Sequence, residues 1–418
     1  MSWLLLGLAV VWALVLLNAF VPVRRSLWLG FSSFLAASLV IELAWVHLVV
    51  GGAVVALLVW AGALDHWAGW VGLALALAEG VALAVTIVRS RATARLADAA
   101  LADLTDELPG RAASRTTRTR NVVFARVAGR ELKLDIVAPA DPAADGARRP
   151  ALVQIHGGAW VVGDKREQGL PLLKALAKQG WVCVNANYRL SPGATWPDHL
   201  VDVKRALAWV RAHADELGVD PGFVAVTGGS AGAHLAAMAA LTADDPQYQP
   251  GFEDADTSVQ ACVPFYGIYD FTNRDDTMPR QFRDWFLQPM IMKAFLADEP
   301  ERFAAASPLD QVRPDAPPFL VVHGDRDTLA PVADARRFVR DLADVSTAPV
   351  LYLELRGAQH AFDVLSSTRT RRVVRAVDRF LTTMWVRHQA GHPADEPQPG
   401  EPGLPDAADG TEVLTDGS

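Results

Sequence analysis

The sequence predicts an α/β domain, a mostly parallel sheet with helices on both faces, preceded by an all-helical membrane region. Residues 3–88 are almost wholly apolar, whereas residues 119–388 alternate short apolar runs with helical stretches. Such alternation is typical of a sheet covered by crossover helices. Residues 271–312 interrupt the alternation, are too long for a simple crossover, and are predicted to form a cap or lid over the strand ends.

Residues 1–90 are predicted to form about three membrane-spanning helices. Residues 3–21 are a nineteen-residue apolar run, close to the roughly 20 residues that cross a bilayer core. No basic segment precedes this run and no small-x-small cleavage site follows it, which argues against a signal peptide. Residues 27–64 are too long for one span but lack a polar turn for two. We predict a span at about residues 44–64, preceded by a helix that lies at the interface or packs beside that span. Residues 68–88 are predicted to form the last span.

Charge placement predicts the orientation of the spans. Three crossings put the arginine pair at 24–25 on the same side as the arginines of residues 89–95, with Asp65 and His66 opposite. The positive-inside rule makes the arginine side cytoplasmic. We therefore expect an outside N-terminus, a location in the inner or plasma membrane, and a cytoplasmic C-terminal domain.

Three ionisable residues, Glu42, His47 and Glu79, lie at membrane depth. Such residues often mark a transport path. So few spans leave little room for one, and we expect these side chains to bond a neighbouring helix or to lie at the interface.

The segments at either end of the α/β domain have distinct compositions. Residues 91–108 are predicted to form an amphipathic helix leaving the membrane, ended by Pro109 and Gly110, within a linker at 91–118. Residues 389–418 hold four Asp and three Glu with no Lys or Arg, and are predicted to be a disordered acidic tail.

Composition excludes some classes of partner and site. No basic patch is interleaved with aromatic residues, so we expect no nucleic-acid binding. The two cysteines, Cys183 and Cys262, lie in apolar strand-like runs and are predicted to be buried free thiols. Neither CxxC nor HExxH occurs, and no metal site is predicted.

Eight strands are predicted between residues 121 and 357. The first two form a hairpin and the others are buried runs of the kind found in parallel sheets. The predicted strands are residues 121–127, 131–137, 151–156, 181–188, 223–228, 261–267, 318–324 and 350–357. The predicted helices are residues 170–179, 197–217, 231–242, 331–342 and 364–388.

The motif Gly228-x-Ser230-x-Gly232 falls where the strand at 223–227 becomes a helix. In a nucleophile elbow the flanking glycines are needed because larger side chains would clash with the neighbouring strand and helix. The alternative is that small residues serve only close packing of helix on sheet. A serine nucleophile needs a base and the base needs an orienting acid.

In this arrangement the acid and then the histidine follow the serine in the chain. His234 is one turn along the same helix, and His323 lies before the acid candidates. His388 and His392 fall near or in the tail, which leaves His360, directly after the strand at 350–357. Asp325 and Asp327 follow an earlier strand, and Asp327 is favoured because it lies farther into the loop.

The segment Ile155 to Trp160 (IHGGAW) follows the strand at 151–156. Its small residues would let backbone N–H groups approach a substrate carbonyl and stabilise a tetrahedral oxyanion, with the N–H of Ala231 as the partner donor. A tight turn that needs glycine for a positive φ is the equally weighted alternative.

These residues together resemble the α/β-hydrolases, specifically the hormone-sensitive-lipase-like carboxylesterases, over about residues 119–388. The motifs are HGGAW, NYRLSP (187–192), WPDHLVD, GGSAG, HGDRD and GAQHAF. The plan of spans followed by such a domain is similar to that of membrane-anchored actinobacterial lipase/esterase proteins. The resemblance implies an α/β-hydrolase fold and a Ser230, Asp327 and His360 triad. It also implies an oxyanion hole formed by Gly157, Gly158 or Ala159 together with Ala231.

Two details refine what the resemblance implies. Ala159 stands where many members have glycine, and its methyl narrows the approach for bulky acyl groups or tertiary-alcohol esters. Tyr188 and Arg189 of NYRLSP, with Asp202, are expected to brace the sheet and the HGG turn rather than contact substrate.

The predicted function is that of a membrane-anchored serine carboxylesterase or lipase, with no metal or organic cofactor. Its expected partners are a small-molecule or lipid ester and the bilayer. Aryl or formyl amide hydrolysis and acyl transfer could use the same triad. A catalytically silent binding module and a channel are weaker alternatives, because all three triad positions are kept and the spans are few.

Overall fold

A computed structural model describes residues 1–24, 26–108, 114–141 and 147–391. Eight strands form one sheet in the order β1-β2-β4-β3-β5-β6-β7-β8. The β1–β2 and β2–β4 pairs are antiparallel and the remaining pairs are parallel. The strands are β1 (Thr116–Val127), β2 (Arg130–Pro139), β3 (Arg149–Ile155), β4 (Val182–Ala186), β5 (Val219–Gly229), β6 (Ala261–Phe265), β7 (Phe319–Gly324) and β8 (Val350–Leu355). All eight predicted strands are confirmed.

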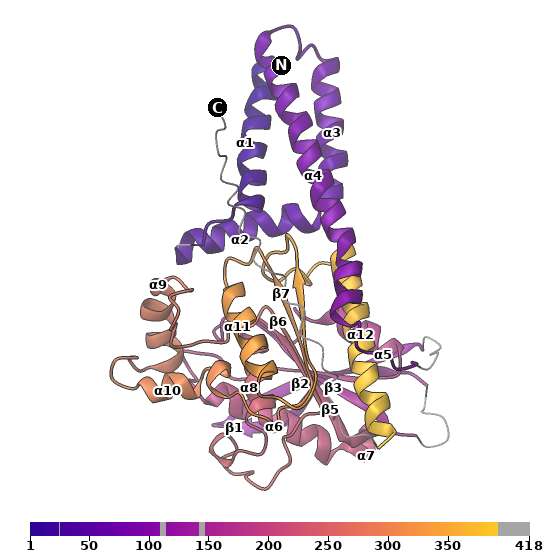
Figure 1. Ribbon diagram of the computed structural model, residues 1–418, viewed down its shortest axis with the longest axis vertical. Coiled ribbons are helices and arrows are strands. Elements are labelled where there is room, and N and C mark those ends of the chain that lie inside the picture. The colour runs from indigo at the N-terminus through magenta and orange to yellow at the C-terminus, as the bar shows by residue number, and fades with distance from the viewer. Residues whose placement is uncertain (25, 109–113, 142–146, 392–418) are drawn as a thin grey trace, which may run out of the picture.

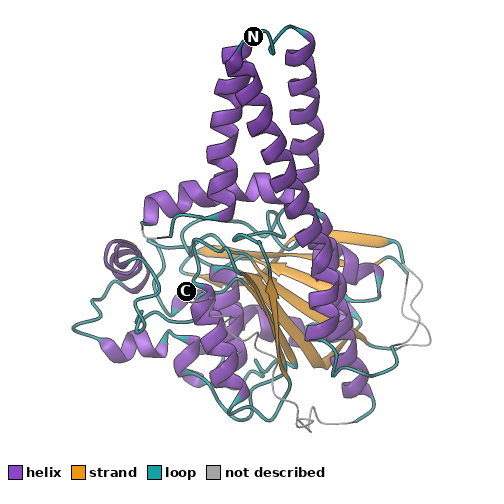
Figure 2. Ribbon diagram, turned by 45° about the horizontal axis from the view of Figure 1, so that its top comes forward, coloured by secondary structure: helices purple, strands orange, loops and turns teal. Residues whose placement is uncertain are grey.

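Helices cover both faces of the sheet (Figure 2). One apolar cluster packs α6, α8 and α11 on one face, and a second packs α5, α12 and the end of α4 on the other. The helices of the domain are α5 (Leu170–Lys178), α6 (Asp198–Ala212), α7 (Ala214–Leu217), α8 (Ala231–Leu241), α11 (Val332–Ala343) and α12 (Thr368–Gln389). The five predicted helices are confirmed, the one at 197–217 divided at His213 into α6 and α7.

The N-terminal apolar helices form a bundle above the sheet (Figure 1). It consists of α1 (Ser2–Phe20), α2 (Leu27–Glu42), α3 (Ala44–Trp60) and the first part of α4 (Trp67–Ala100). α1 and α4 are long and apolar enough to cross a membrane, and α2 with α3, bent by 81°, could supply a third span. α2 lies across the base of the upright helices, as expected for the helix preceding the span at 44–64.

The helix predicted at 91–108, within the linker at 91–118, is wrong in its boundaries. α4 runs without a break from Trp67 to Ala100, and residues 101–108 are not helical. Ala97, Leu101 and Leu104 are buried in the apolar cluster beneath α12. No glycine or proline interrupts residues 81–100, so α4 continues into the domain core. Pro109 and Gly110 lie outside the described residues, as does the tail from 392.

The predicted cap at 271–312 contains short helices: α9 (Arg280–Phe282), the π-helix η3 (Arg283–Met292), α10 (Pro300–Ala305) and the 3₁₀ turn η4 (Pro308–Asp310). It lies beside the sheet, with α9 near the free end of α2 (Figures 1 and 2). Two carbonyl groups of the insertion contact the domain. The Ile291 carbonyl accepts from the N–H of Trp196 at 2.9 Å, and the Ala306 carbonyl oxygen faces the His234 ring.

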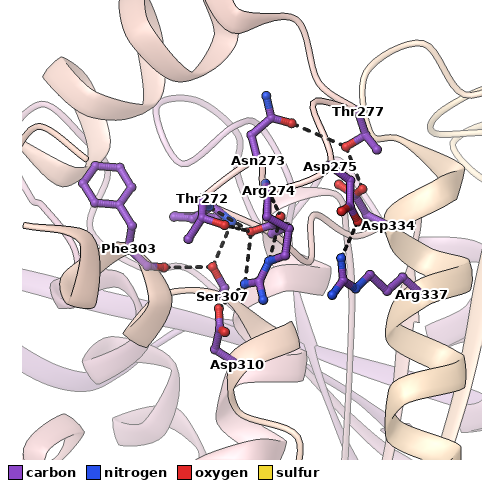
Figure 3. Close-up of polar contacts among 12 residues, drawn as sticks. Thr272, Asn273, Arg274, Asp275, Thr277, Phe303, Ser307, Asp310, Asp334 and Arg337 are labelled. Carbon is purple, nitrogen blue, oxygen red and sulfur yellow. Dashed lines mark hydrogen bonds and ion pairs between the residues drawn. The ribbon is translucent and has the colours of Figure 1, made fainter. Parts of the chain in front are cut away.

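Polar contacts join the two ends of this insertion to each other and fasten its beginning to the domain (Figure 3). Arg274 bonds Asp310, which joins the beginning of the insertion to its end. Thr277 Oγ1 donates to Asp334 of α11 at 2.7 Å, and Arg337 of the same helix pairs with Asp275. These contacts fix the insertion against α11.

Candidate active site

Ser230 occupies a strained turn between β5 and α8. Its φ of 57° and ψ of −120° are rarely adopted by a residue with a side chain. A Cβ on Gly228 would lie 2.4 Å from Gly232, and one on Gly232 would lie 2.2 Å from the Ile155 carbonyl oxygen. The glycines on either side of the serine are therefore required sterically, and the turn presents a half-buried Ser230 at the carboxyl end of β5.

Asp327 and His360 are in contact although they come from different loops. His360 Nδ1 lies 2.7 Å from Asp327 Oδ2, and both side chains are buried. The other Asp327 oxygen accepts the N–H groups of Leu329 and Ala330, each at 2.8 Å. Burial alone would raise the pKa of Asp327, but His360, His323 and a backbone donor hold it below its ordinary value. Asp327 is therefore fixed as a carboxylate beside the imidazole.

The other acid candidate, Asp325, points elsewhere. Its Oδ1 accepts from the N–H of Gly357 at 2.7 Å, so it fixes the loop that leads to His360. Burial raises the pKa of Asp325 above its ordinary value. Of the two aspartates, only Asp327 meets the His360 ring in the described structure.

The remaining histidines after Ser230 have structural partners. His234 is buried, stacks on Phe271 with ring centroids 4.4 Å apart, and contacts the Ala306 carbonyl oxygen at 2.8 Å. His234 therefore packs between α8 and the insertion. His323 Nε2 lies 3.1 Å from the Ala330 carbonyl oxygen. His388 faces Asp220 at 3.3 Å, and His392 lies outside the described residues.

Ser230 and His360 are not joined by a hydrogen bond in the described structure, in which the ring's side-chain hydrogen-bond partner is Asp327. Such contacts are often long without substrate and shorten in the complex. Tyr266 packs against the pair: its ring is 4.6 Å from the His360 ring, and its hydroxyl donates to Asp363. A Cβ on Gly229 would lie 2.6 Å from the Tyr266 hydroxyl oxygen. Tyr266 therefore contacts the His360 ring and also lies against the elbow at Gly229.

The HGG turn lies next to the nucleophile elbow. A Cβ on Gly157 would be 3.1 Å from Ser230 Cβ, and the Gly157 N–H already donates to Gln168 Oε1 at 2.7 Å. The N–H groups of Gly158 and Ala159 have no hydrogen-bond partner within the described part of the chain, and both residues are partly exposed. These two groups, with the N–H of Ala231 at the start of α8, are the donors left available for an oxyanion.

The turn is braced as the sequence predicted. Tyr188 stacks on His156 at 4.5 Å and donates its hydroxyl to the His156 carbonyl at 3.2 Å. Arg189 pairs with the buried Asp202 through two bonds of 2.7 and 2.9 Å. Tyr188 thus braces the HGG turn, and Arg189 with Asp202 joins the loop after β4 to α6; that the three do not contact substrate stays a prediction.

Four residues of the site escaped the sequence analysis. Gln168 holds the Gly157 N–H, and Gln359 Oε1 accepts the backbone N–H groups of Thr328 and His360 at 2.8 and 2.9 Å. Tyr266 packs on His360 as described above. The fourth, Phe34, comes from α2, and its ring meets the His360 ring edge to face at 5.8 Å. Only Gln359 carried a signal, its place beside His360 in GAQHAF.

The described residues contain no group of three or more His, Cys, Asp or Glu side chains that could hold a metal ion. Cys183 and Cys262 are buried and unpaired, as predicted. Burial raises the pKa of both thiols well above the ordinary value, so neither is a thiolate at neutral pH.

The chain resembles known esterases in sequence and in structure. The model of the BD-FAE family matches residues 134–342. The probable carboxylic ester hydrolase LipM of Mycobacterium tuberculosis is 51% identical over 271 residues, which cover 65% of this chain and 62% of that protein. Esterase LipQ of the same organism is 49% identical over 259 residues, covering 62% and 61%. The matched part of the chain thus spans about three fifths of the length of these curated relatives.

Among solved structures, the butyrate-bound esterase Est2 of Thermogutta terrifontis is 26% identical, with a TM-score of 0.53. The match covers 68% of this chain and 96% of that one. The fold predicted for residues 119–388, that of an α/β-hydrolase, is confirmed.

Proposed function

The chain belongs to the BD-FAE family, and from that premise we propose that it is a membrane-anchored serine carboxylesterase or lipase. The observation that carries the proposal is the buried 2.7 Å contact between Asp327 and His360, together with a serine held on a glycine-flanked elbow. The names of the relatives in Mycobacterium tuberculosis support ester hydrolysis as the reaction.

In the proposed reaction Ser230 Oγ attacks the carbonyl carbon of an ester, and His360 Nε2 accepts the hydroxyl proton. The carbonyl oxygen becomes an oxyanion that the N–H groups of Gly158, Ala159 and Ala231 stabilise. His360 then returns the proton to the leaving alcohol oxygen as the carbon–oxygen bond breaks. Water, deprotonated by His360, attacks the acyl-enzyme, and Ser230 leaves with that proton.

Asp327 has a positioning role in this scheme. As a carboxylate it accepts the Nδ1–H of His360, so the imidazole keeps Nε2 free to take the serine proton. It also stabilises the imidazolium that forms after proton transfer. The N–H groups of Leu329 and Ala330 hold the carboxylate in place for both tasks.

The apolar helices support anchoring in a bilayer. α1, α4 and the bent pair α2–α3 allow up to three crossings. Arg24 and Arg89 lie at the end of the bundle nearest the domain, whereas the α3–α4 loop with Asp65 lies at the far end. We propose a multi-pass protein of the plasma membrane with its hydrolase domain in the cytoplasm.

The proposed chemistry is tested on the full chain in detergent micelles with p-nitrophenyl butyrate and a fluorophosphonate probe. Ser230→Ala is expected to lower kcat by about 10⁴-fold or more and to abolish covalent labelling. Asp327→Asn is expected to lower kcat strongly, by about 10³–10⁴-fold, through loss of the correct tautomer.

Asp325→Asn is the matched control, two residues away and half-buried, and is expected to retain most of the activity. Full labelling and turnover in Ser230→Ala would remove Ser230 from the mechanism. Equal losses in Asp325→Asn and Asp327→Asn would assign the effect to the loop rather than to the contact with His360.

A further inference from the structure

The membrane-region helix α2 lies directly on the loops that carry Asp327 and His360. The Phe34 and His360 rings meet edge to face, with centroids 5.8 Å apart and an interplanar angle of 84°. One turn earlier in α2, the Gly30 carbonyl accepts a hydrogen bond from Thr328 Oγ1 at 3.1 Å. A Cβ on Gly30 would lie 3.3 Å from the Thr328 carbonyl oxygen, so the two backbones pack closely. α2 therefore belongs to the surroundings of the proposed triad.

Contacts near both ends hold α2 in this place. Just before the helix, Arg24 Nη2 donates to the Asp325 carbonyl at 2.7 Å. At its last residue, Glu42 Oε1 lies 3.3 Å from Nε of the fully buried Arg369 of α12, which also donates to Ser90 of α4 at 3.2 Å. Two of these partners come from the hydrolase domain, on the loop after β7 and on α12, so the helix is fixed against the domain.

A second face of α2 is apolar and exposed. Trp28, Phe31, Leu35 and Leu39 are spaced three or four residues apart, which places them on one side of the helix. Their exposed fractions are 73%, 48%, 50% and 55%. A helix with an exposed apolar stripe that includes tryptophan is typical of a membrane interface.

Phe34 connects this exposed stripe to the site. The Phe31 and Phe34 rings are 6.1 Å apart, and Phe34 in turn meets His360. An aromatic surface thus leads from the lipid-facing side of α2 to the imidazole. The HGG turn carries a second apolar side chain, Val162, which is 61% exposed and whose N–H bonds the Gly158 carbonyl at 3.0 Å.

We infer that α2 forms one wall of the active site and that Phe34 sets substrate specificity there. The substrate class is an ester with one long hydrocarbon chain, dissolved in the membrane, whose chain lies against Phe34 while its carbonyl meets Ser230. The inference rests on the proposed ester hydrolysis. A helix of the membrane region, α2, thereby takes part in selecting the substrate.

The test compares two esters on the full chain reconstituted in phosphatidylcholine vesicles: p-nitrophenyl palmitate carried in the vesicles and water-soluble p-nitrophenyl acetate. The readout is the ratio of kcat/KM for palmitate to that for acetate, which does not depend on the folded fraction of a preparation. Phe34→Ala is expected to lower this ratio by about tenfold or more, because the chain loses its apolar contact. Phe34→Leu, which keeps an apolar side chain, is expected to hold the ratio within about threefold of wild type.

Leu14→Ala, at an exposed apolar residue of α1, is the matched control and is expected to leave the ratio unchanged. If Phe34→Ala lowers both reactions by the same factor, or changes neither, the specificity role of α2 is overturned. Wild-type protein that hydrolyses neither ester, or Ser230→Ala protein that hydrolyses both, would instead overturn the proposed function itself.

Discussion

Two buried aspartates show how local partners decide the charge of a carboxylate. Asp327 faces two histidine rings and backbone donors, and its pKa is held below the ordinary value. Asp334 of α11 is equally buried, but its Oδ1 accepts one hydrogen bond, from Thr277 at 2.7 Å, and its Oδ2 has no hydrogen-bond partner within the described residues. Burial, reinforced by Asp270 and Asp275, raises the pKa of Asp334 to about 7. Asp334 therefore weakens the fold when it is ionised.

Asp334→Asn is expected to stabilise the protein in a pH-dependent way. An aspartate in the unfolded chain titrates near 3.9, so the folded protein binds the proton more tightly, and wild-type stability falls as pH rises from about 4 to 7. The variant lacks this titration, and its advantage should grow across that window to about 1–3 kcal/mol at pH 8. Thermal unfolding at pH 5 and pH 8 measures the difference.

Asp298→Asn, at an exposed carboxylate of the insertion at 271–312, is the control: it removes one negative charge from a position that is not buried. An Asp334→Asn protein with the same shift in Tm at both pH values would contradict the assignment. So would a variant less stable than wild type at pH 8.

At the scale of the element, α4 belongs to two environments. Its first part stands beside α1 and α3 with exposed apolar side chains such as Leu77, which is 64% exposed. Its end packs under α12, and just beyond its last turn Leu101 is 1% exposed in the same cluster as Trp385. The helix and the turn that follows it are thus part of the hydrolase core.

Leu101→Ala is expected to destabilise the hydrolase domain by about 2–5 kcal/mol, because it opens a cavity in a packed cluster. Leu77→Ala makes the same chemical change on the exposed part of α4 and is expected to cost far less in detergent. Denaturant unfolding of the full chain, followed by tryptophan fluorescence and by ester hydrolysis, measures both. Equal midpoints for the two variants would show that the end of α4 does not stabilise the domain.

At the scale of the whole molecule, the proposed orientation in the membrane can be tested by labelling single introduced cysteines, because both native cysteines are buried. His66→Cys, at the far end of the bundle, is expected to react with a membrane-impermeant maleimide added to intact cells. Arg95→Cys, at an exposed position of α4 near the domain, is expected to react only after the cells are permeabilised. The opposite pattern would reverse the orientation, and labelling of the unsubstituted chain would void the assay.

The sequence predicted the elements well because each carries its own local signal. Strands such as β5 and β7 are continuous apolar runs, and glycines mark the elbow at Ser230. The order of Ser230, Asp327 and His360 along the chain also limited the choice of partners. These features depend on residues that are near one another in sequence or on a rule of chain order.

Contacts between distant segments could not be predicted in the same way. The bond between Thr328 and Gly30 joins residues 298 positions apart, and Phe34 reaches His360 only because α2 folds back over the domain. The extent of α4 was misjudged because an alanine-rich helix can continue wherever a partner surface, here α12, is present. Tertiary packing, not local pattern, decided these features.

The continuous course of α4 has a consequence for how the enzyme would search for substrate. With the proposed anchoring, a single helix that passes from the bilayer into the core would hold the edge of the sheet that carries Ser230 at one height above the lipid. The enzyme and its ester would then meet by diffusion within the plane of the membrane. The rate would depend on the mole fraction of ester among the surrounding lipids. Diluting the vesicles with buffer would leave turnover unchanged, whereas diluting the ester with inert lipid would slow it.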